Sequence, residues 1–312
     1  MNMLVTGGAG FIGRWTVKKL LEEGHKVWIL DDLSNGSIDN IRDFESCGSV
    51  EFVQGDIKDE GLLERIFTGS FDLCFHLAAS INVQDSIDDP VTTFRNDVAG
   101  TFNVLEQCRK HGTKMVFMST CMVYDRASGE EGIDELHPVK PASPYAGSKI
   151  AGESLVLSYW HAYKLPAVVI RPFNTYGPFQ KSGGEGGVIA IFIKNSLEGR
   201  VLKIYGDGNQ TRDFLYVEDC ADFIVRAGCL GNADGQIINA GTGKDITIND
   251  LAVLIAQDRS PIEHVPHIHP QSEIQKLLCD PGKAYRLLSW RSKTGIDEGI
   301  GKTEKWMKMS RR

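Results

Sequence analysis

The sequence predicts an α/β fold, a doubly wound parallel sheet followed by a smaller C-terminal α/β lobe. Short apolar runs alternate with amphipathic helical stretches from Met3 to Arg171, which is the pattern of parallel strands covered by helices on both faces. The first strand, helix and strand together take about thirty residues, the size of one βαβ unit with its right-handed crossover. A chain of 312 residues is also long enough for two lobes.

The order of the elements follows from the spacing of the apolar residues. Continuous apolar runs predict strands, and apolar positions three or four apart predict helices. Ser143 and Pro144 are typical of a helix cap and a first helical turn, so they mark the start of one long helix. Beyond Gly177 the alternation loosens, and we expect loops over 182–187, 206–208 and 264–270. Strands are expected over 3–6, 27–30, 50–53, 73–76, 114–118 and 167–171, and helices over 11–23, 61–67, 91–111 and 145–163.

The composition excludes several classes of function. The chain has 34 basic and 41 acidic residues, and its net charge of −7 argues against nucleic acid or an anionic membrane as the main partner. No apolar run approaches the ~20 residues of a membrane span. Seven cysteines without a CxxC pair indicate neither a disulfide framework nor a zinc cage. The N-terminus opens on a strand instead of a secretory signal, so we expect a reduced, cytoplasmic protein.

Three glycines after the first strand form a dinucleotide-binding pattern, GxxGxxG, at Gly7, Gly10 and Gly13. Gly7 permits a tight turn, Gly10 lets the backbone approach a pyrophosphate, and Gly13 lets the helix pack closely on the strand. Eighteen residues past Gly13, the second strand ends in Asp31 and Asp32. A carboxylate there can accept hydrogen bonds from both ribose hydroxyls and repels a 2′-phosphate. The sequence therefore predicts NAD as the cofactor, in preference to NADP.

Tyr145 and Lys149 are four residues apart on a predicted helix, so their side chains project from one face. A phenol with a pKa near 10 is a poor base at neutral pH, and a neighbouring ammonium favours the phenolate. Tyr145 could then remove a proton from a sugar hydroxyl during hydride transfer. Thr120 follows the predicted strand 114–118 and could orient the same oxygen. We expect Thr120, Tyr145 and Lys149 to be the catalytic residues.

Several further segments, in order along nearly the whole chain, resemble the extended short-chain dehydrogenases/reductases that act on nucleotide sugars. The resemblance implies a Rossmann NAD-binding domain over 1–175 and a nucleotide-sugar lobe over 176–312, with the chain crossing between the two. It also implies a homodimer formed through two helices of each subunit. The matching segments are TGGAGFIG at 6–13, Asp31, Leu77-Ala78-Ala79, Asn96, Ser119-Thr120 with Val123-Tyr124, Tyr145 with Lys149, Arg171-Pro172-Phe173-Asn174 with Tyr176-Gly177-Pro178, and Gly206-Asp207-Gly208 with Arg212-Asp213.

The resemblance also implies a set of site residues. Asn174 and Arg212 would hold the diphosphate, and residues 202–206 would lie near the nucleobase. Asp56 and Ile57 could face the adenine, although an ordinary acid at the end of a strand explains that pair equally well. The expected cofactor-binding residues are Gly7, Gly10, Phe11, Ile12, Gly13, Asp31, Asp32, Asn35, Asp56, Ile57, Leu77, Ala78, Ala79, Asn96, Ser119, Tyr145, Lys149 and Pro172, and the expected substrate-binding residues are Cys121, Met122, Asn174, Val188, Tyr205, Arg212 and Glu273.

The segment after Thr120 distinguishes between the reactions of the family, whose members share oxidation at sugar carbon 4. Dehydratases typically carry Ser-Thr-Asp-Glu-Val-Tyr, where the acid pair eliminates water. This chain has Cys121 and Met122 at the two acidic positions, and a thioether has no proton chemistry. A 4-epimerase needs no extra acid or base. The resemblance therefore predicts a 4-epimerase of UDP-hexoses or UDP-N-acetylhexosamines.

Two alternatives stay open: a nucleotide-sugar dehydratase that uses Cys121 in an altered mechanism, and an NAD-binding regulatory subunit without turnover. The intact set of Thr120, Tyr145 and Lys149 argues against the second.

Family members usually carry Arg-Pro-Gly-Glu near the diphosphate, whereas this chain reads His269-Pro270-Gln271-Ser272-Glu273, and histidine is a weaker phosphate partner. His264, His267 and His269 alternate with prolines in an expected loop and do not predict a metal site.

Overall fold

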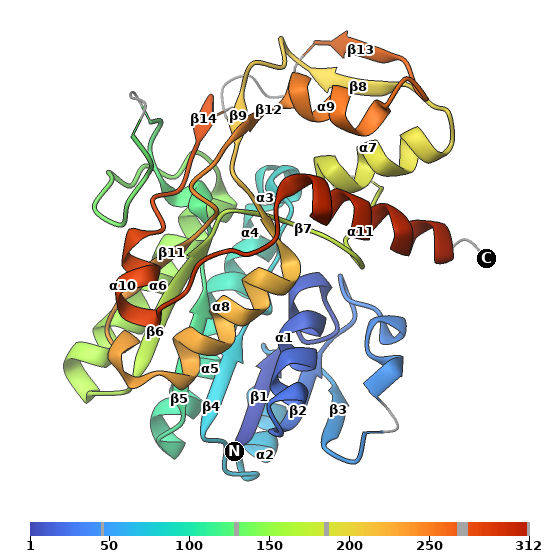
Figure 1. Cartoon of the computed structure of the whole chain (residues 1–312). Coiled ribbons are helices and arrows are strands. Elements are labelled where there is room, and N and C mark those ends of the chain that lie inside the picture. The colour runs from blue at the N-terminus through green and yellow to red at the C-terminus, as the bar shows by residue number, and fades with distance from the viewer. Residues whose placement is uncertain (45–46, 128–130, 184–186, 267–273, 311–312) are drawn as a thin grey trace.

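A computed structural model describes residues 1–44, 47–127, 131–183, 187–266 and 274–310 of the chain (Figure 1). Its centre is a seven-stranded sheet in the order β11-β6-β5-β4-β1-β2-β3, in which every neighbouring pair is parallel. This order confirms the predicted doubly wound fold. The strands are β1 (Asn2–Thr6), β2 (Lys26–Asp31), β3 (Val50–Gln54), β4 (Leu73–His76), β5 (Lys114–Met118), β6 (Ala167–Pro172) and β11 (Ile237–Ala240).

The strand order reverses at β1, which pairs with β2 on one side and with β4 on the other. The strands on either side of this switch point send their following segments in opposite directions, so a crevice opens at their carboxyl ends. The residues that leave this edge are Gly7 after β1, Asp31 at the end of β2 and Leu77 after β4. The topology therefore places the glycine turn, the ribose carboxylate and the 77–79 segment around one crevice.

Helices cover both faces of this sheet, as Figure 1 shows. One face packs against α1 (Phe11–Glu22), α8 (Val217–Cys229) and α10 (Gly282–Leu288), through buried residues such as Val17, Phe223 and Leu288. The other face packs against α2 (Glu60–Phe67), α5 (Gly100–His111) and α6 (Pro144–Tyr163), through residues such as Leu105 and Val156. Each fully buried side chain of this size contributes about 1.5–3 kcal/mol, so these two layers hold the sheet rigid.

The helix expected over residues 91–111 is present and contains a π-helical turn. Short α3 (Val83–Asp88) is followed by α4 (Pro90–Phe94), which begins with the Asp89 side chain accepting a hydrogen bond from the Thr92 N–H at 3.0 Å. A π-helix over Arg95–Ala99 then leads into α5. The π-helical turn holds one residue more than an α-helical turn and changes which side chains face inward. The expected long helix over 91–111 is therefore present, and apolar spacing does not reveal the π-turn within it.

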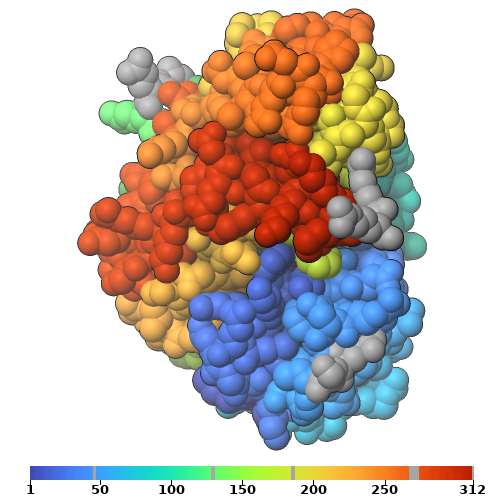
Figure 2. Space-filling model, turned by 45° about the vertical axis from the view of Figure 1, so that its right-hand side comes forward, coloured from blue at the N-terminus to red at the C-terminus, as the bar shows by residue number. Residues whose placement is uncertain are grey.

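The second lobe has its own core of apolar residues between short sheets and helices. The predicted loop at residue 264 is wrong in part, because His264 lies in a strand and its ring nitrogen is 2.9 Å from Asn249 Oδ1. Figure 2 shows the C-terminal helix as a red band between the orange lobe and the blue N-terminal region. The elements are β7 (Asn174–Tyr176) paired with β10 (Phe214–Tyr216), β8 (Leu202–Tyr205) with β13 (Ile262–Val265), β9 (Thr211–Arg212) with β12 (Ile246–Thr247) and β14 (Lys276–Leu277), and helices α7 (Val188–Leu197), α9 (Ile248–Ala256) and α11 (Ile296–Met309).

The second half of the chain also returns to the first. Strand β11 extends the central sheet by pairing with β6, and α8 packs along α1. Residues 217–240 thus form part of the NAD-binding lobe that we expected to end at residue 175. The division of the chain at that residue stays a prediction. In the described residues, we find no helix that combines the length and the apolar character of a membrane span.

Candidate active site

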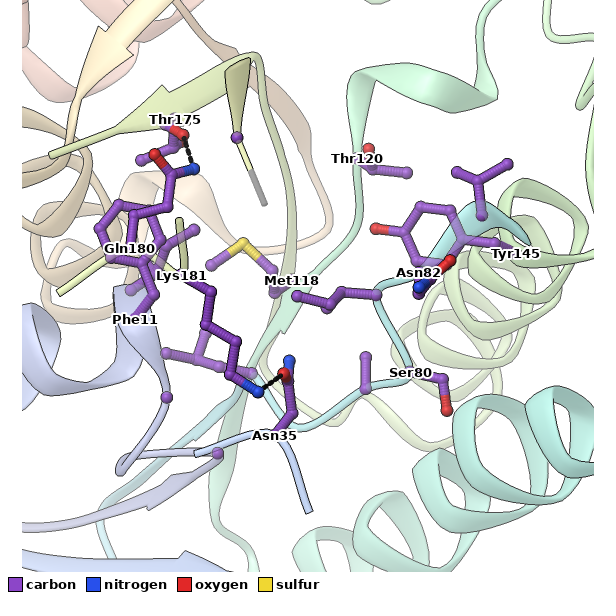
Figure 3. A pocket seen from close by; sticks show the side chains of 18 of the residues that line it. Phe11, Asn35, Ser80, Asn82, Met118, Thr120, Tyr145, Thr175, Gln180 and Lys181 are labelled. Carbon is purple, nitrogen blue, oxygen red and sulfur yellow. Dashed lines mark hydrogen bonds between the residues drawn. The ribbon is translucent and has the colours of Figure 1, made fainter. Parts of the chain in front are cut away.

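A cleft of about 1230 Å³ lies at the carboxyl ends of the central strands and is lined by both halves of the chain. Figure 3 shows one part of it, with Thr120 and Tyr145 on one wall and Phe11, Gln180 and Lys181 on the other. Every site residue predicted from the sequence lines this cleft, with the exception of Glu273, which lies outside the described residues. The structure therefore brings the expected cofactor-binding, catalytic and substrate-binding residues together in one space.

The glycine turn between β1 and α1 has no room for side chains. Gly7 has a φ of +72°, and a Cβ there would lie 2.7 Å from the Ala78 backbone nitrogen. A Cβ at Gly13 would overlap the carbonyl oxygen of Gly7. The left-handed conformation of Gly7 produces the sharp turn, and the bare Gly13 lets α1 start directly against it. The N-terminus of α1 therefore lines the cleft, with Gly10 to Gly13 at its surface.

Asp31 holds the turn in place from the end of β2. One carboxylate oxygen accepts a hydrogen bond from the Ala9 N–H at 2.9 Å, and the other accepts one from the Leu33 N–H at 2.9 Å. Burial raises the pKa of Asp31, and these two hydrogen bonds oppose that effect. Asp32 points away toward Ser34, whose backbone and hydroxyl both donate to it. Of the two acids, Asp31 is therefore the one fixed beside the glycine turn.

Tyr145 and Lys149 project from the first turns of α6, which begins with the Ser143 side chain accepting a hydrogen bond from the Ala146 N–H at 3.2 Å. The Lys149 ammonium donates to the Met118 carbonyl at 3.0 Å and lies 6.0 Å from the centre of the Tyr145 ring. The hydroxyl of Thr120 lies near the Tyr145 phenol and favours its ionised form. Figure 3 shows the Thr120 and Tyr145 side chains close together on one wall of the cleft. The three predicted catalytic residues thus form one cluster.

Burial sets the proton affinities of this cluster. It raises the pKa of Tyr145, with Asp97 and Cys121 adding to the rise and the Thr120 hydrogen bond opposing it. Burial also lowers the pKa of Lys149, while Asp97 and Glu153 favour its ammonium form. The sequence predicts a lowered phenol pKa, whereas in the structure burial of the ring raises it.

The substrate side of the cleft carries donors and a buried thiol. Arg212 donates from Nη1 to the Ile274 carbonyl at 2.7 Å, which fixes its guanidinium at the wall. The amide Nδ2 of Asn174 is buried and has no hydrogen-bond partner among the described residues, so it is a donor available to a ligand. Burial raises the pKa of Cys121 to about 12, which keeps its thiol protonated at neutral pH. Met122 lies beside it in the lining.

The geometry is that of a dinucleotide fold, and comparison with known proteins places it within one family. The family model described as the NAD dependent epimerase/dehydratase family matches residues 3–241. The chain belongs to this family. Cofactor use by NAD is therefore a property of the family to which the chain belongs, in agreement with the prediction from Gly7, Gly10, Gly13 and Asp31.

Family relatives match the chain over almost its whole length. A UDP-glucose 4-epimerase from Mycolicibacterium smegmatis is 39% identical over 97% of this chain and 97% of its own length. The X-ray structure of Pal from Bacillus thuringiensis is 64% identical, has a TM-score of 0.97, and matches over 99% of this chain and 100% of that one. A UDP-glucose 4-epimerase from Thermotoga maritima, solved with UDP-glucose, is 34% identical with a TM-score of 0.93 over the whole of both chains.

The residues of this epimerase/dehydratase-family cleft fit NAD. In the described segment 1–44, the first turn of α1 has no acidic side chain and Gly10 gives it no side-chain cap, so its backbone N–H groups are left for the pyrophosphate. Asp31 keeps further lone pairs for ribose hydroxyls beyond the two hydrogen bonds it accepts. Asn96 lines the same cleft, where its amide donates to the Ser80 hydroxyl at 3.0 Å.

The sequence analysis missed many of the lining residues, among them residues 80–83 and Lys181. Residues 80–83 follow β4 at the switch point, a signal that could have identified them. Lys181 donates to Asn35 Oδ1 at 2.6 Å and joins the two halves of the chain across the cleft (Figure 3). Two residues earlier, Phe179 has a φ of +71° and its ring centre lies 3.7 Å from the Arg14 guanidinium, a contact that no local pattern in the sequence indicates.

The three histidines that the sequence analysis considered as metal ligands lie only partly within the described residues. In the described ranges, no group of three or more His, Cys, Asp or Glu side chains is placed to hold a metal ion. His264 is exposed and paired with Asn249, whereas His267 and His269 lie outside those ranges.

Proposed function

We propose that this protein is an NAD-dependent nucleotide-sugar 4-epimerase that acts on a UDP-hexose or a UDP-N-acetylhexosamine. The observation that carries the proposal is the cluster of Thr120, Tyr145 and Lys149 in a cleft where Cys121 and Met122 occupy the positions of an eliminating acid pair. Relatives named as UDP-glucose 4-epimerases, matched along the whole chain, support the choice of reaction and of nucleotide.

The chain's own residues supply the proton chemistry. Tyr145 removes the proton from the hydroxyl at carbon 4 of the sugar and returns it at the end of the cycle. Thr120 orients the same oxygen, because its hydroxyl already faces the phenol. Lys149 is anchored on Met118 and favours the phenolate through its positive charge. Bound NAD supplies the hydride acceptor at carbon 4, and Asn174 and Arg212 would hold the diphosphate while the sugar turns.

The thiol of Cys121 and the thioether of Met122 support epimerisation over elimination. A base at the position of Met122 is needed to remove a proton next to the keto group, and a thioether has none to offer. Cys121, protonated at neutral pH, is a poor base too. One observation favours the second candidate, a dehydratase, because a buried protonated thiol facing the sugar pocket could give its proton to a leaving hydroxyl.

A panel of nucleotide sugars distinguishes the two candidates. The protein is incubated in D2O with UDP-glucose, UDP-galactose and their N-acetyl forms, and products are read by mass spectrometry and NMR. We expect interconversion of 4-epimers with unchanged mass and no deuterium on carbon, because the hydrogen of carbon 4 never enters solvent. Loss of water with solvent deuterium on carbon would establish the dehydratase instead. If all four sugars stay unchanged, the 4-epimerase proposal fails.

We further propose that the protein is a homodimer assembled through the faces of α4, α5 and α6. Val91, Phe94 and Tyr163 are each at least 57% exposed there, and Phe102 is 43% exposed. Exposed apolar side chains gathered on neighbouring helices are typical of an interface between subunits. Light scattering is expected to give twice the mass of the 34.5 kDa chain, and Phe94→Asp is expected to shift the particle toward monomer. A monomeric wild-type protein at micromolar concentration would contradict this.

We also propose that the protein works in the cytoplasm. All seven cysteines are free thiols in the structure, five of them buried, as befits a reducing compartment. A stable disulfide in protein isolated from its native cells would count against this location.

A further inference from the structure

Asp97 is a buried carboxylate at the edge of the active site, 2% exposed, in the middle of the π-helix. One of its oxygens accepts a hydrogen bond from the Ser80 N–H at 2.7 Å. The other lies 3.0 Å from the Ser148 hydroxyl, which shares its single proton between this carboxylate and the Tyr145 carbonyl at 2.7 Å. Ser148 lies on α6 next to Lys149, and Ser80 lies on the segment that lines the cleft on the same side as Tyr145 (Figure 3). Asp97 therefore joins the Ser80 segment to the helix that carries Tyr145 and Lys149.

Two consecutive residues of the π-helix, Asn96 and Asp97, both contact Ser80. The Asn96 amide donates to the Ser80 hydroxyl at 3.0 Å, while Asp97 accepts from the Ser80 N–H. The two residues therefore bind Ser80 through its hydroxyl and through its backbone N–H, and both lie in the π-helix, a feature that is frequent at functional sites.

A chain of hydrogen bonds fixes the π-helix to the glycine-turn strand. The Thr101 hydroxyl donates to the Asp97 carbonyl at 2.6 Å, so its oxygen accepts from His76 Nε2 at 2.9 Å. His76 then carries its proton on Nε2, and Nδ1 accepts from the Thr6 hydroxyl at 2.7 Å. Burial lowers the pKa of His76 to about 3, so the ring stays neutral. These hydrogen bonds hold the backbone of Asp97 in place relative to β1 and β4.

Asp97 differs from the other nearby acid, Glu153, in its effect on Tyr145 and Lys149. Glu153 also faces Lys149, but Glu153 is already matched by Arg171, whose Nε and Nη2 donate to it at 2.7 and 2.5 Å. Asp97 accepts hydrogen bonds from neutral donors instead, so its negative charge acts on the catalytic pair. Both Tyr145 and Lys149 are influenced by it.

We propose that Asp97 is a positioning residue of the active site that ties the Ser80 segment to α6 and sets the charge balance of the Tyr145–Lys149 pair. The proposal deepens the proposed function and rests on it for the identity of the reaction. Asp97 acts in two ways: its hydrogen bonds hold the Ser80 segment against α6, and its charge favours the ammonium form of Lys149 and the neutral phenol of Tyr145.

The direction of the expected pH effect follows from the groups that face the pair. Asp97 and Cys121 face Tyr145 together with the Thr120 hydroxyl, while Asp97, Glu153 and neutral His76 face Lys149. The charge of Asp97 raises the pKa of Tyr145. Its removal leaves the phenolate easier to form, so the rising limb of the pH profile moves to lower pH. The same removal lowers the pKa of Lys149, so its ammonium is also lost earlier.

Asp97→Asn tests the charge with little change of shape. The amide oxygen can still accept from the Ser80 N–H, and the Ser148 hydroxyl can accept from the new amide. We expect the rising limb of kcat/KM against pH to shift down by about one pH unit. Ser148→Ala is the matched control: it removes a hydrogen bond of Asp97 but keeps the charge, and its rising limb should stay within about 0.2 pH units of wild type. An unshifted profile in Asp97→Asn would overturn the proposal.

A spectroscopic readout keeps this test independent of the reaction. Phenolate absorbance is titrated in the NAD-bound wild-type protein and in Asp97→Asn, and the same curve from Tyr145→Phe is subtracted to isolate Tyr145. The expected result is the same downward shift even if the panel of nucleotide sugars finds another activity, so failure of the proposed function and failure of this inference are separate outcomes. If Asp97→Asn does not fold, Asp97→Ser keeps a small acceptor and is titrated in its place. An equal midpoint in that variant and wild type would refute the role of Asp97.

Discussion

Tyr145→Phe is expected to lower kcat by about 10²- to 10⁴-fold while the protein keeps its NAD. The phenol is the proton carrier of the proposed reaction, and the substitution removes one oxygen without changing the packing of the ring, which is nearly buried beside Thr120. KM should change little, since the diphosphate contacts proposed for Asn174 and Arg212 lie elsewhere in the cleft. Steady-state kinetics and the NAD content per chain, measured after denaturation, check both halves of the expectation.

Tyr159→Phe is the matched control for this experiment. Tyr159 lies on the same helix, α6, with the same degree of burial, and its hydroxyl donates to Glu106 at 2.5 Å. Loss of that hydrogen bond is expected to cost about 1–3 kcal/mol of stability with no effect on turnover. Equal activities for Tyr145→Phe and wild type would rule out the phenol as the proton carrier.

Glu153→Leu is expected to lower the free energy of unfolding by about 3–5 kcal/mol. Glu153 and Arg171 form a two-pronged ion pair with both side chains almost fully buried, and the Ser119 hydroxyl donates to the same carboxylate. Removal of the carboxylate leaves a guanidinium in the interior without its counter-charge, which costs more than the pair itself contributes. Urea denaturation followed by circular dichroism, at constant NAD and protein concentration, measures the change.

Two further variants distinguish the cost of an unpaired charge from the loss of packing. The double variant Glu153→Leu with Arg171→Met removes both charges and should recover a large part of the stability. Glu298→Gln breaks an exposed pair with Lys302 whose charged atoms are 2.8 Å apart, and it should cost less than about 1 kcal/mol. If the double variant is as unstable as the sum of its single variants, the buried pair is not coupled and the explanation is wrong.

Sequence analysis correctly predicted the features that depend on the spacing of residues close together in the sequence. The strands of the first half were found because buried parallel strands are continuous apolar runs, and Tyr145 and Lys149 because a separation of four places side chains on one helix face. The glycine turn was found for the same reason, since Gly7 and Gly13 occur at fixed offsets from a strand. Such signals depend on neighbours along the chain, and the structure confirms the fold they predict.

The features that were missed depend on contacts between distant residues. Asp97 reads in the sequence as an ordinary acid on an amphipathic helix, and only the π-turn and Ser148, 51 positions away, make it part of the site. Lys181 reaches Asn35 across 146 positions. The strand β11 was not predicted because its short apolar run follows a region where the alternation had already loosened. In each of these cases, partners brought in by tertiary structure decide the role.

The last strand of the central sheet has a consequence for how the protein is made. Strand β6 is buried along its full length, and its outer edge is completed only by β11, so residues up to 240 must leave the ribosome before the sheet is closed. Until then, a nascent chain ending near residue 175 exposes an unpaired apolar edge and the face later covered by α8, both of which promote aggregation. We therefore expect the cofactor-binding half, expressed alone as residues 1–175, to aggregate, because β6 then lacks its partner β11.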